Sequence, residues 1–282
     1  MKIKKSLSNI IVHTVLAILA VIWVLPIVWV VLISFRAEKG AYTSTFLPQS
    51  YTLSNYIRLF TETDTFNFPL WFGNTLVVAI FSCIISTFYV LSVSYVMSRL
   101  RFKLRKKFMN IALILGMFPG FMAMIAVYYI LKGVGLTTGA LKLVSLVLVY
   151  SGGAGLTFYV AKGFFDTIPK AIDEAAIIDG CTRWQVFTKV IIPLSKPIIV
   201  QTIVASFMAP WMDFIFARVI AGSEPQYYTV SVGLWNMLTR ENITNYYTRF
   251  AAGAVLVSIP IAILFCSVQK YYMEGNAGAV KG

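Results

Sequence analysis

Asp213 is the residue of this chain whose type and position most clearly suggest a chemical role, because it is an ionisable group in an apolar environment. It lies in a long apolar stretch, two residues after Trp211, and Arg218 follows about a turn and a half of helix beyond it. A carboxylate near aromatic rings suits a polyhydroxylated ligand such as a sugar, because it accepts hydrogen bonds from hydroxyls while rings stack on sugar faces. In the alternative, Asp213 pairs with Arg218 or with a residue of a partner chain as a structural lock. We prefer the lock, because a site shared by two subunits need not draw ligands from both.

Other residue types that commonly carry catalysis are scarce. The cysteines Cys83, Cys181 and Cys266 form no Cys-x-x-Cys pair and have no histidine beside them, so neither a disulfide framework nor a metal site is expected. The single histidine, His13, lies near the N-terminus, where a catalytic base would lack partners. The net charge of +13 could indicate nucleic acid, but the basic residues lie at the ends of long apolar runs, which argues against such a partner.

Composition places the chain in a membrane. Hydrophobic residues make up 59% of it and charged residues 12%, whereas a soluble domain carries about 25% charged residues. A spanning helix needs about 20 mostly apolar residues. Six stretches qualify, at approximately 10–34, 71–98, 108–131, 141–162, 198–220 and 248–271. The first is too long for a secretory signal and lacks a small-residue cleavage site.

The basic residues also predict the orientation. The run from Arg99 to Lys107 is short and strongly basic and resists translocation, so both termini are expected in the cytoplasm. The 221–247 loop is too long for a simple turn and is a candidate contact for an external partner. The expected parts are an N-terminal membrane helix at 1–35, an external loop at 36–70, a five-helix core at 71–271 with a cytoplasmic loop at 163–197 and an external loop at 221–247, and a cytoplasmic tail at 272–282.

The cytoplasmic loop reads as two short helices at an angle. Thr167 can cap the first helix and Pro169 suits its first turn, while Gly180 stands where a left-handed residue would end it. Its apolar residues share one face, at the helical spacing of Ile168, Ala171, Ile172, Ala175 and Ile178.

The second helix has its own start and stop signals. Thr182 and Gln185 match a capping box, and Pro193 disfavours continuation through Ile192. Ser195 can cap the fifth span.

The first of these helices could rest on the membrane surface or dock on a partner. Interfacial helices usually carry several Lys or Arg on the polar face, but this helix is rich in alanine and carries Asp173 and Glu174 beside Lys170. Small residues beside a carboxylate suit close docking into a groove of another protein, so we favour the partner.

The spacing within this loop resembles a known family motif. Glu174-Ala175-Ala176, then Gly180, then Val190-x-Ile192-Pro193 is similar to the EAA motif of importer-type ABC permeases, with Val190 and Ile192 as conservative departures. The resemblance extends to sugar permeases of the carbohydrate-uptake class through three further segments and the tail. These are Asn55-Tyr56, Asn74-Thr75, Trp211-x-Asp213-Phe214 and the C-terminal Gly278–Gly282, the last being similar to the smaller maltose-type permease subunit.

The resemblance implies an all-α integral membrane protein of the bacterial plasma membrane, with six transmembrane helices in the type I ABC importer permease fold. It implies a non-catalytic subunit for sugar uptake that couples closure of two ATPase subunits to alternating access. A homologous second permease, forming a heterodimer, and an external sugar-binding protein would complete the complex, surrounded by lipid. The residues it assigns to ATPase coupling are Glu174, Ala175, Ala176, Asp179, Gly180 and Pro193, and the residues of an ATPase-contacting tail are Gly278, Val280, Lys281 and Gly282.

Several alternatives stay open. No cofactor is expected, because the chain has no Gly-x-x-x-x-Gly-Lys-Ser/Thr loop and ATP would bind the partner subunits. Maltose or maltodextrin is the preferred substrate, with raffinose-type and galacto-oligosaccharides as alternatives. An ion-coupled secondary transporter commonly shows repeated halves, and an intramembrane enzyme needs paired catalytic residues; we find neither, with Asp213 the only acidic residue well inside a span.

Overall fold

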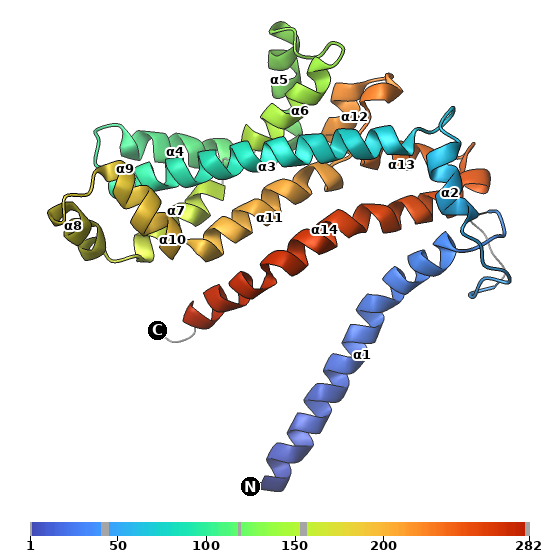
Figure 1. Cartoon of the computed structure of the whole chain (residues 1–282), viewed down its shortest axis with the longest axis horizontal. Coiled ribbons are helices and arrows are strands. Elements are labelled where there is room, and N and C mark those ends of the chain that lie inside the picture. The colour runs from blue at the N-terminus through green and yellow to red at the C-terminus, as the bar shows by residue number, and fades with distance from the viewer. Residues whose placement is uncertain (1, 41–44, 118–119, 153–156, 280–282) are drawn as a thin grey trace. The chain divides into compact units, whose positions relative to one another are not determined.

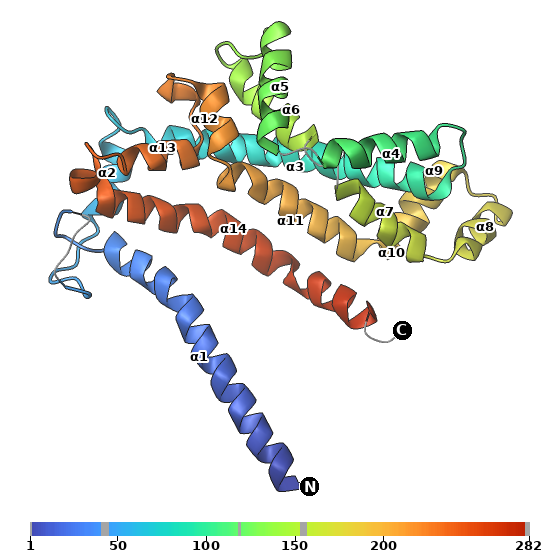
Figure 2. The same ribbon diagram turned by 180° about the vertical axis from the view of Figure 1, so that it is seen from behind.

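The computed structural model describes residues 2–40, 45–117, 120–152 and 157–279 (Figures 1 and 2). Within them every regular element is a helix, apart from one isolated bridge between Arg36 and Tyr51, so the predicted all-α class is confirmed. In chain order the elements are α1 (Lys2–Ser34), α2 (Ser54–Thr61), α3 (Phe68–Arg99), α4 (Arg105–Gly116), α5 (Gly120–Gly133), α6 (Leu141–Gly152), α7 (Thr157–Thr167), α8 (Lys170–Ile178), α9 (Arg183–Gln185), the π-helical η2 (Val186–Ile191), α10 (Ile192–Leu194), α11 (Lys196–Met212), α12 (Ile215–Ala221), the 3-10 turn η3 (Pro225–Tyr227), α13 (Val230–Met237) and α14 (Ile243–Ala279).

Four stretches are long and apolar enough to cross a membrane. They are Asn9–Ser34, Phe68–Arg99, Leu141–Thr167 and Ile243–Tyr271. A fifth is reached if Arg183–Leu194 and Lys196–Met212, bent by 83°, count as one span. The remaining predicted span, 108–131, consists of the shorter helices α4 and α5, and residues 118–119 between them lie outside the described part of the chain. The cytoplasmic placement of the two termini stays a prediction.

The chain forms two compact units. The first comprises residues 1–69 and 233–259, and the second comprises residues 70–232 and 260–282. Both long external loops expected from the sequence contain helices, α2 in 36–70 and α13 in 221–247.

Most of the described side chains of α1 are exposed in the first unit. Side chains 9–28 are all exposed within this unit although the stretch is almost wholly apolar, so this surface requires an apolar environment, as lipid provides. The end of α1 is held by Asn55 of α2, whose amide donates to the carbonyls of Ser34 (3.0 Å) and Arg36 (2.8 Å). The Asn55 carbonyl accepts from the Thr248 hydroxyl at 3.0 Å, so one buried amide joins α1, α2 and α14 within this unit.

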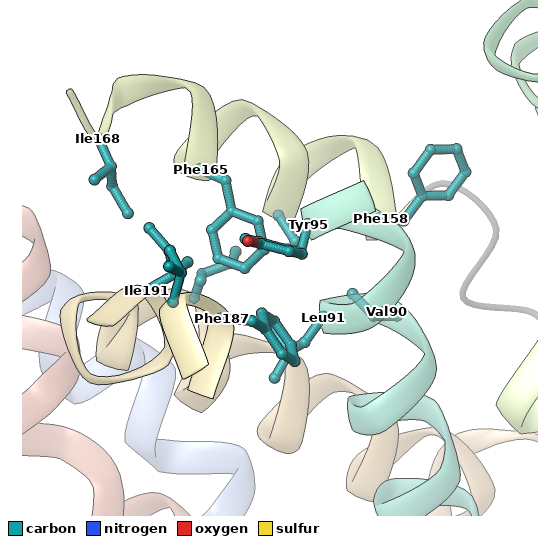
Figure 3. Close-up of a cluster of buried hydrophobic side chains, with 11 residues drawn as sticks. Val90, Leu91, Tyr95, Phe158, Phe165, Ile168, Phe187 and Ile191 are labelled. Atoms are coloured by element: carbon teal, nitrogen blue, oxygen red, sulfur yellow. The ribbon is translucent and has the colours of Figure 1, made fainter. Parts of the chain in front are cut away.

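The second unit contains a hydrophobic core that supports the 163–197 loop (Figure 3). Val90, Leu91 and Tyr95 of α3 meet Phe165 of α7 and Phe187 of η2 there. Tyr95 and Phe187 pack with ring centroids 4.7 Å apart. This cluster provides the apolar support for the loop, because η2 buries Val186, Phe187 and Ile191 in it.

The first turns of α3 clamp the segment after α12. The Trp71 indole donates to the Pro225 carbonyl at 2.9 Å. The Asn74 amide donates to the Gln226 and Tyr228 carbonyls at 2.9 and 3.1 Å. The Thr75 hydroxyl accepts from the Val230 N–H at 2.8 Å. Three side chains of one helix therefore satisfy four backbone groups, which fixes residues 225–230 against α3.

Candidate functional site

The 163–197 loop, predicted to be cytoplasmic, presents α8 as a separate, exposed helix. In Figures 1 and 2, α8 lies at the end of the second unit, beside α9. None of its residues is buried. Of the predicted apolar stripe, Ala171, Ile172, Ala175 and Ile178 are exposed, Ile178 by 85%, whereas Ile168, which precedes the helix, is buried in the core cluster. Ala176 alone among the α8 side chains packs on the core cluster. Glu174 and Ala175 are exposed, as are Asp179, Gly180 and Pro193, so most of the sequence-predicted coupling residues lie at the surface.

The end of α8 follows the prediction and its start does not. Gly180 has φ +86°, its N–H donates to the Ile177 carbonyl (3.0 Å), and the Cys181 N–H donates to the Ala176 carbonyl (2.9 Å). These two bonds form a Schellman motif, which confirms Gly180 as the stop. The predicted Thr167 cap is wrong. Helix α7 runs through Thr167, whose hydroxyl donates back to the Phe164 carbonyl, and α8 begins after Pro169 without a side-chain cap.

The second helix of the loop begins as predicted. The Gln185 N–H donates to the Thr182 hydroxyl (3.3 Å), and the Thr182 N–H donates to the Gln185 side chain (2.8 Å), so the capping box is confirmed.

Its end differs from the prediction, because the chain stays helical through Pro193 to Leu194. The π-helical turn just before it is wider than an α-turn, which relieves the clash between a proline ring and the preceding turn. Ser195 does not cap α11; its hydroxyl donates to the Ile191 carbonyl at 2.7 Å.

An ion pair fixes α8 to the end of α3. Arg99 Nε lies 2.9 Å from Asp173 Oδ2, and the two side chains are 4% and 14% exposed. Arg99 also donates to the Ile168 carbonyl at 3.0 Å. Burial raises the pKa of Asp173 above the usual carboxyl value, and the neighbouring Glu174 acts in the same direction while Arg99 opposes both. Sequence reasoning treated Arg99 only as an orientation signal and missed this contact.

Asp213 lies at a break between α11 and α12. Its carboxylate accepts from the backbone N–H groups of Phe216 (3.3 Å) and Ala217 (3.0 Å), so it caps the start of α12. It also accepts from the Tyr150 hydroxyl at 2.6 Å. The predicted fifth span is therefore two helices, because Asp213 serves as the cap of the second.

The other two intramembrane candidates lie apart from this carboxylate. Arg218 donates to the Tyr228 hydroxyl, and no ion pair joins it to Asp213 among the described side chains. A lock between Asp213 and a residue of a partner chain stays a prediction. Trp211 is 4% exposed and packs against Phe72, with ring centroids 5.2 Å apart.

Two cavities of the second unit meet at Tyr150. One, of about 720 Å³, is mostly apolar and is lined by α5, α6 and α12, with Asp213 at its wall. The other, of about 240 Å³, is lined by the hydroxyl-bearing residues Ser86, Thr157, Thr202 and Ser206. Tyr150 was missed in the sequence, since nothing local distinguishes it from other aromatic residues of a span.

The sequence-predicted tail is described only in part. Gly278 lies in α14, whereas Val280, Lys281 and Gly282 lie outside the described residues.

Comparisons with known proteins agree over nearly the whole chain. The family described as "binding-protein-dependent transport system inner membrane component" matches residues 90–272. The galactooligosaccharides transport system permease protein GanQ of Bacillus subtilis (strain 168) is 34% identical, over 100% of this chain and 99% of its own. The maltodextrin transport system permease protein MdxG of the same organism is 32% identical, over 99% of this chain and 98% of its own. A chain in the crystal structure of a bacterial ABC transporter involved in the import of the acidic polysaccharide alginate shares the fold, with a TM-score of 0.78 and 22% identity over 95% of this chain and 98% of that one.

Proposed function

Because this chain belongs to the family of binding-protein-dependent transport system inner membrane components, we propose that it is the permease subunit of an ATP-driven oligosaccharide importer. The fold shared with a chain of an ABC transporter and the oligosaccharide permeases among its relatives support this proposal. The chain is an integral membrane protein whose helices include at least four long enough to span a bilayer.

The exposure of α8 is the observation that carries the coupling part of the proposal. Ile172, Ala175 and Ile178 are apolar and lie at the surface, with Ile178 85% exposed, and the exposed Glu174 stands beside them. Both ends of the helix are fixed, by the Arg99–Asp173 ion pair and by the Schellman motif at Gly180. A rigid helix with small residues and one carboxylate suits a groove on a partner, and we assign that partner as a cytoplasmic ATPase.

The rest of the complex follows from the same assignment. The sequence has no phosphate-binding loop of the ATPase type, so two partner ATPases would bind and hydrolyse ATP, and this subunit would do no catalysis. A homologous second permease would form a heterodimer with this chain, and an external sugar-binding protein would deliver the substrate. The tail from Gly278 to Gly282 would contact the ATPases.

The substrate is proposed at the level of the oligosaccharide. Relatives named for galactooligosaccharides and for maltodextrin are 34% and 32% identical to the chain, a difference too small to choose between them. We propose maltodextrin and galacto-oligosaccharides as the first substrates to test. Uptake of each labelled sugar by the purified complex with its binding protein distinguishes them, and uptake of neither would contradict this assignment.

The test of coupling reverses one charge on α8. Glu174→Lys should abolish sugar-stimulated ATP hydrolysis and uptake in proteoliposomes, because it places a cation on the docking face. Asp64→Lys makes the same charge reversal at another exposed carboxylate, outside both the predicted cytoplasmic loop and the 221–247 loop, and should leave both activities intact. Normal coupling in the Glu174 variant would refute α8 as the docking helix without touching the assignment of the chain as a permease.

A further inference from the structure

Residues 100–108, the connection between α3 and α4 together with the first turn of α4, form the most strongly basic surface of the described chain. Its cations are Arg101, Lys103, Arg105, Lys106 and Lys107, and it contains no acidic residue. All of them are exposed except the half-buried Arg105, whose charge acts on Asp166. The other four form no ion pair with any described carboxylate. We call residues 100–108 the basic loop.

Apolar side chains alternate with these cations. Phe102, Leu104 and Phe108 are 38%, 51% and 50% exposed, each next to a basic residue in the sequence. On a surface that faces water, exposed phenylalanine side chains among lysines gain no free energy from burial. At the edge of a bilayer the same pattern is favourable, because the apolar groups enter the acyl boundary while the cations reach the headgroups.

The local backbone adds to the positive potential of the basic loop. Helix α4 begins inside it at Arg105, with no side-chain cap and no acidic residue in its first turn. The positive end of the helix dipole thus lies among three cations, an arrangement that an anion relieves. This feature strengthens a site that already rests on the exposed charges and the apolar side chains.

We propose that the basic loop binds the phosphate headgroups of anionic phospholipids in the cytoplasmic leaflet. The inference rests on the membrane placement of the chain, and not on its sugar or its ATPase. The loop directly follows α3, a helix long enough to span, so it lies where hydrocarbon gives way to headgroups. A protein partner is disfavoured, because protein interfaces are depleted in lysine, whereas clusters of basic residues directly beside a span are typical of contacts with anionic lipids.

The test compares two variants of the full-length chain that lose the same charge. Lys103→Gln, Lys106→Gln and Lys107→Gln together neutralise the basic loop. Lys39→Gln, Lys132→Gln and Arg240→Gln together remove three exposed cations from segments predicted to be external. Binding of phosphatidylglycerol and of phosphatidylcholine to each purified protein in neutral detergent is measured by native mass spectrometry, and thermal melting checks folding.

We expect the loop variant to lose about 100-fold in phosphatidylglycerol affinity, since each basic residue near an anionic surface contributes about a fivefold factor. The control variant should stay within about twofold, and phosphatidylcholine binding should be equal in all three proteins. If the triple variant melts early, Lys106→Gln alone should still lose about fivefold.

Three results would overturn the proposal. One is unchanged phosphatidylglycerol affinity in the loop variant, and another is an equal loss in the control. The third is displacement of the lipid by inorganic phosphate at matched phosphate concentration, which would mean that the site takes a free anion. If the first of these results comes with a loss of co-purified ATPase, the surface binds that protein instead.

Discussion

Replacing Gly180 by alanine should destabilise the C-terminal end of α8 by about 1–2 kcal/mol, the cost of holding an L-residue in the left-handed region. Gly180 has φ +86°, and a Cβ added there would meet no atom within 4 Å. The expected cost is therefore backbone strain alone, without a steric contribution. Asparagine tolerates this conformation better than alanine, so Gly180→Asn should cost less than Gly180→Ala.

Hydrogen exchange measures this cost directly. A loss of 1–2 kcal/mol speeds local opening by about 5–30-fold, so the amides of Gly180 and Cys181, which close the helix, should exchange faster by that factor. Gly163→Ala is the matched control. Gly163 lies in α7 without positive φ, and a Cβ there also meets nothing within 4 Å, so its replacement should be neutral or slightly stabilising.

Two results would refute the reasoning. If Gly180→Ala leaves exchange in α8 unchanged, the Schellman motif does not hold the helix end in solution. If alanine and asparagine are equally damaging, the cost comes from something other than left-handed strain. In the assembled importer we also expect Gly180→Ala to reduce sugar-stimulated ATP hydrolysis, because a frayed α8 presents its docking face less often.

Four other perturbations test three further parts of the molecule. Thr75→Val leaves the buried N–H of Val230 without its acceptor and should cost about 1–3 kcal/mol in thermal unfolding; an unchanged melting temperature would contradict the clamp. Asp213→Ala should destabilise by about 1–2 kcal/mol through loss of the α12 cap, and Tyr150→Phe by less, because it leaves the cap intact. Melting of both variants tests the order, and equal losses would mean that the cap contributes little. Deleting residues 278–282 should weaken co-purification of the ATPases, and an unchanged complex would count against the tail assignment.

The ends of the loop helices divide into those that the sequence predicts and those that it does not. The Gly180 stop and the Thr182 capping box involve residues close together in the chain, so both can be predicted without knowledge of the tertiary structure. Thr167 was misassigned as a cap because its signal competes with continuation of α7, and packing of Phe165 in the core cluster supports that continuation. Pro193 was misassigned as a stop because a π-helical turn is not encoded by any simple residue pattern.

Contacts between residues far apart in the chain could not be predicted from this sequence alone. The partner of Arg99 is on a helix about 70 positions away, and that of Asp213 is Tyr150, 63 positions away. The Asn55 and Asn74-Thr75 segments were noticed only as a resemblance. The structure supplies their physical reason, since each satisfies backbone groups of a distant segment: Asn55 at the end of α1, and Asn74 with Thr75 along residues 225–230.

The unbroken helical path from Arg183 to Leu194 makes this part of the 163–197 loop a rigid arm with one bend. Its twelve residues extend about 18 Å, and at the buried Ser195 they meet α11 at 83°. A rotation of only about 10° at that bend would move the far end, next to α8, by about 3 Å. The extra backbone atoms of the π turn keep this arm continuous past Pro193, where a proline hinge would otherwise absorb the motion. Under the proposed coupling, we expect a small displacement of α8 to reach α11 as a change of tilt.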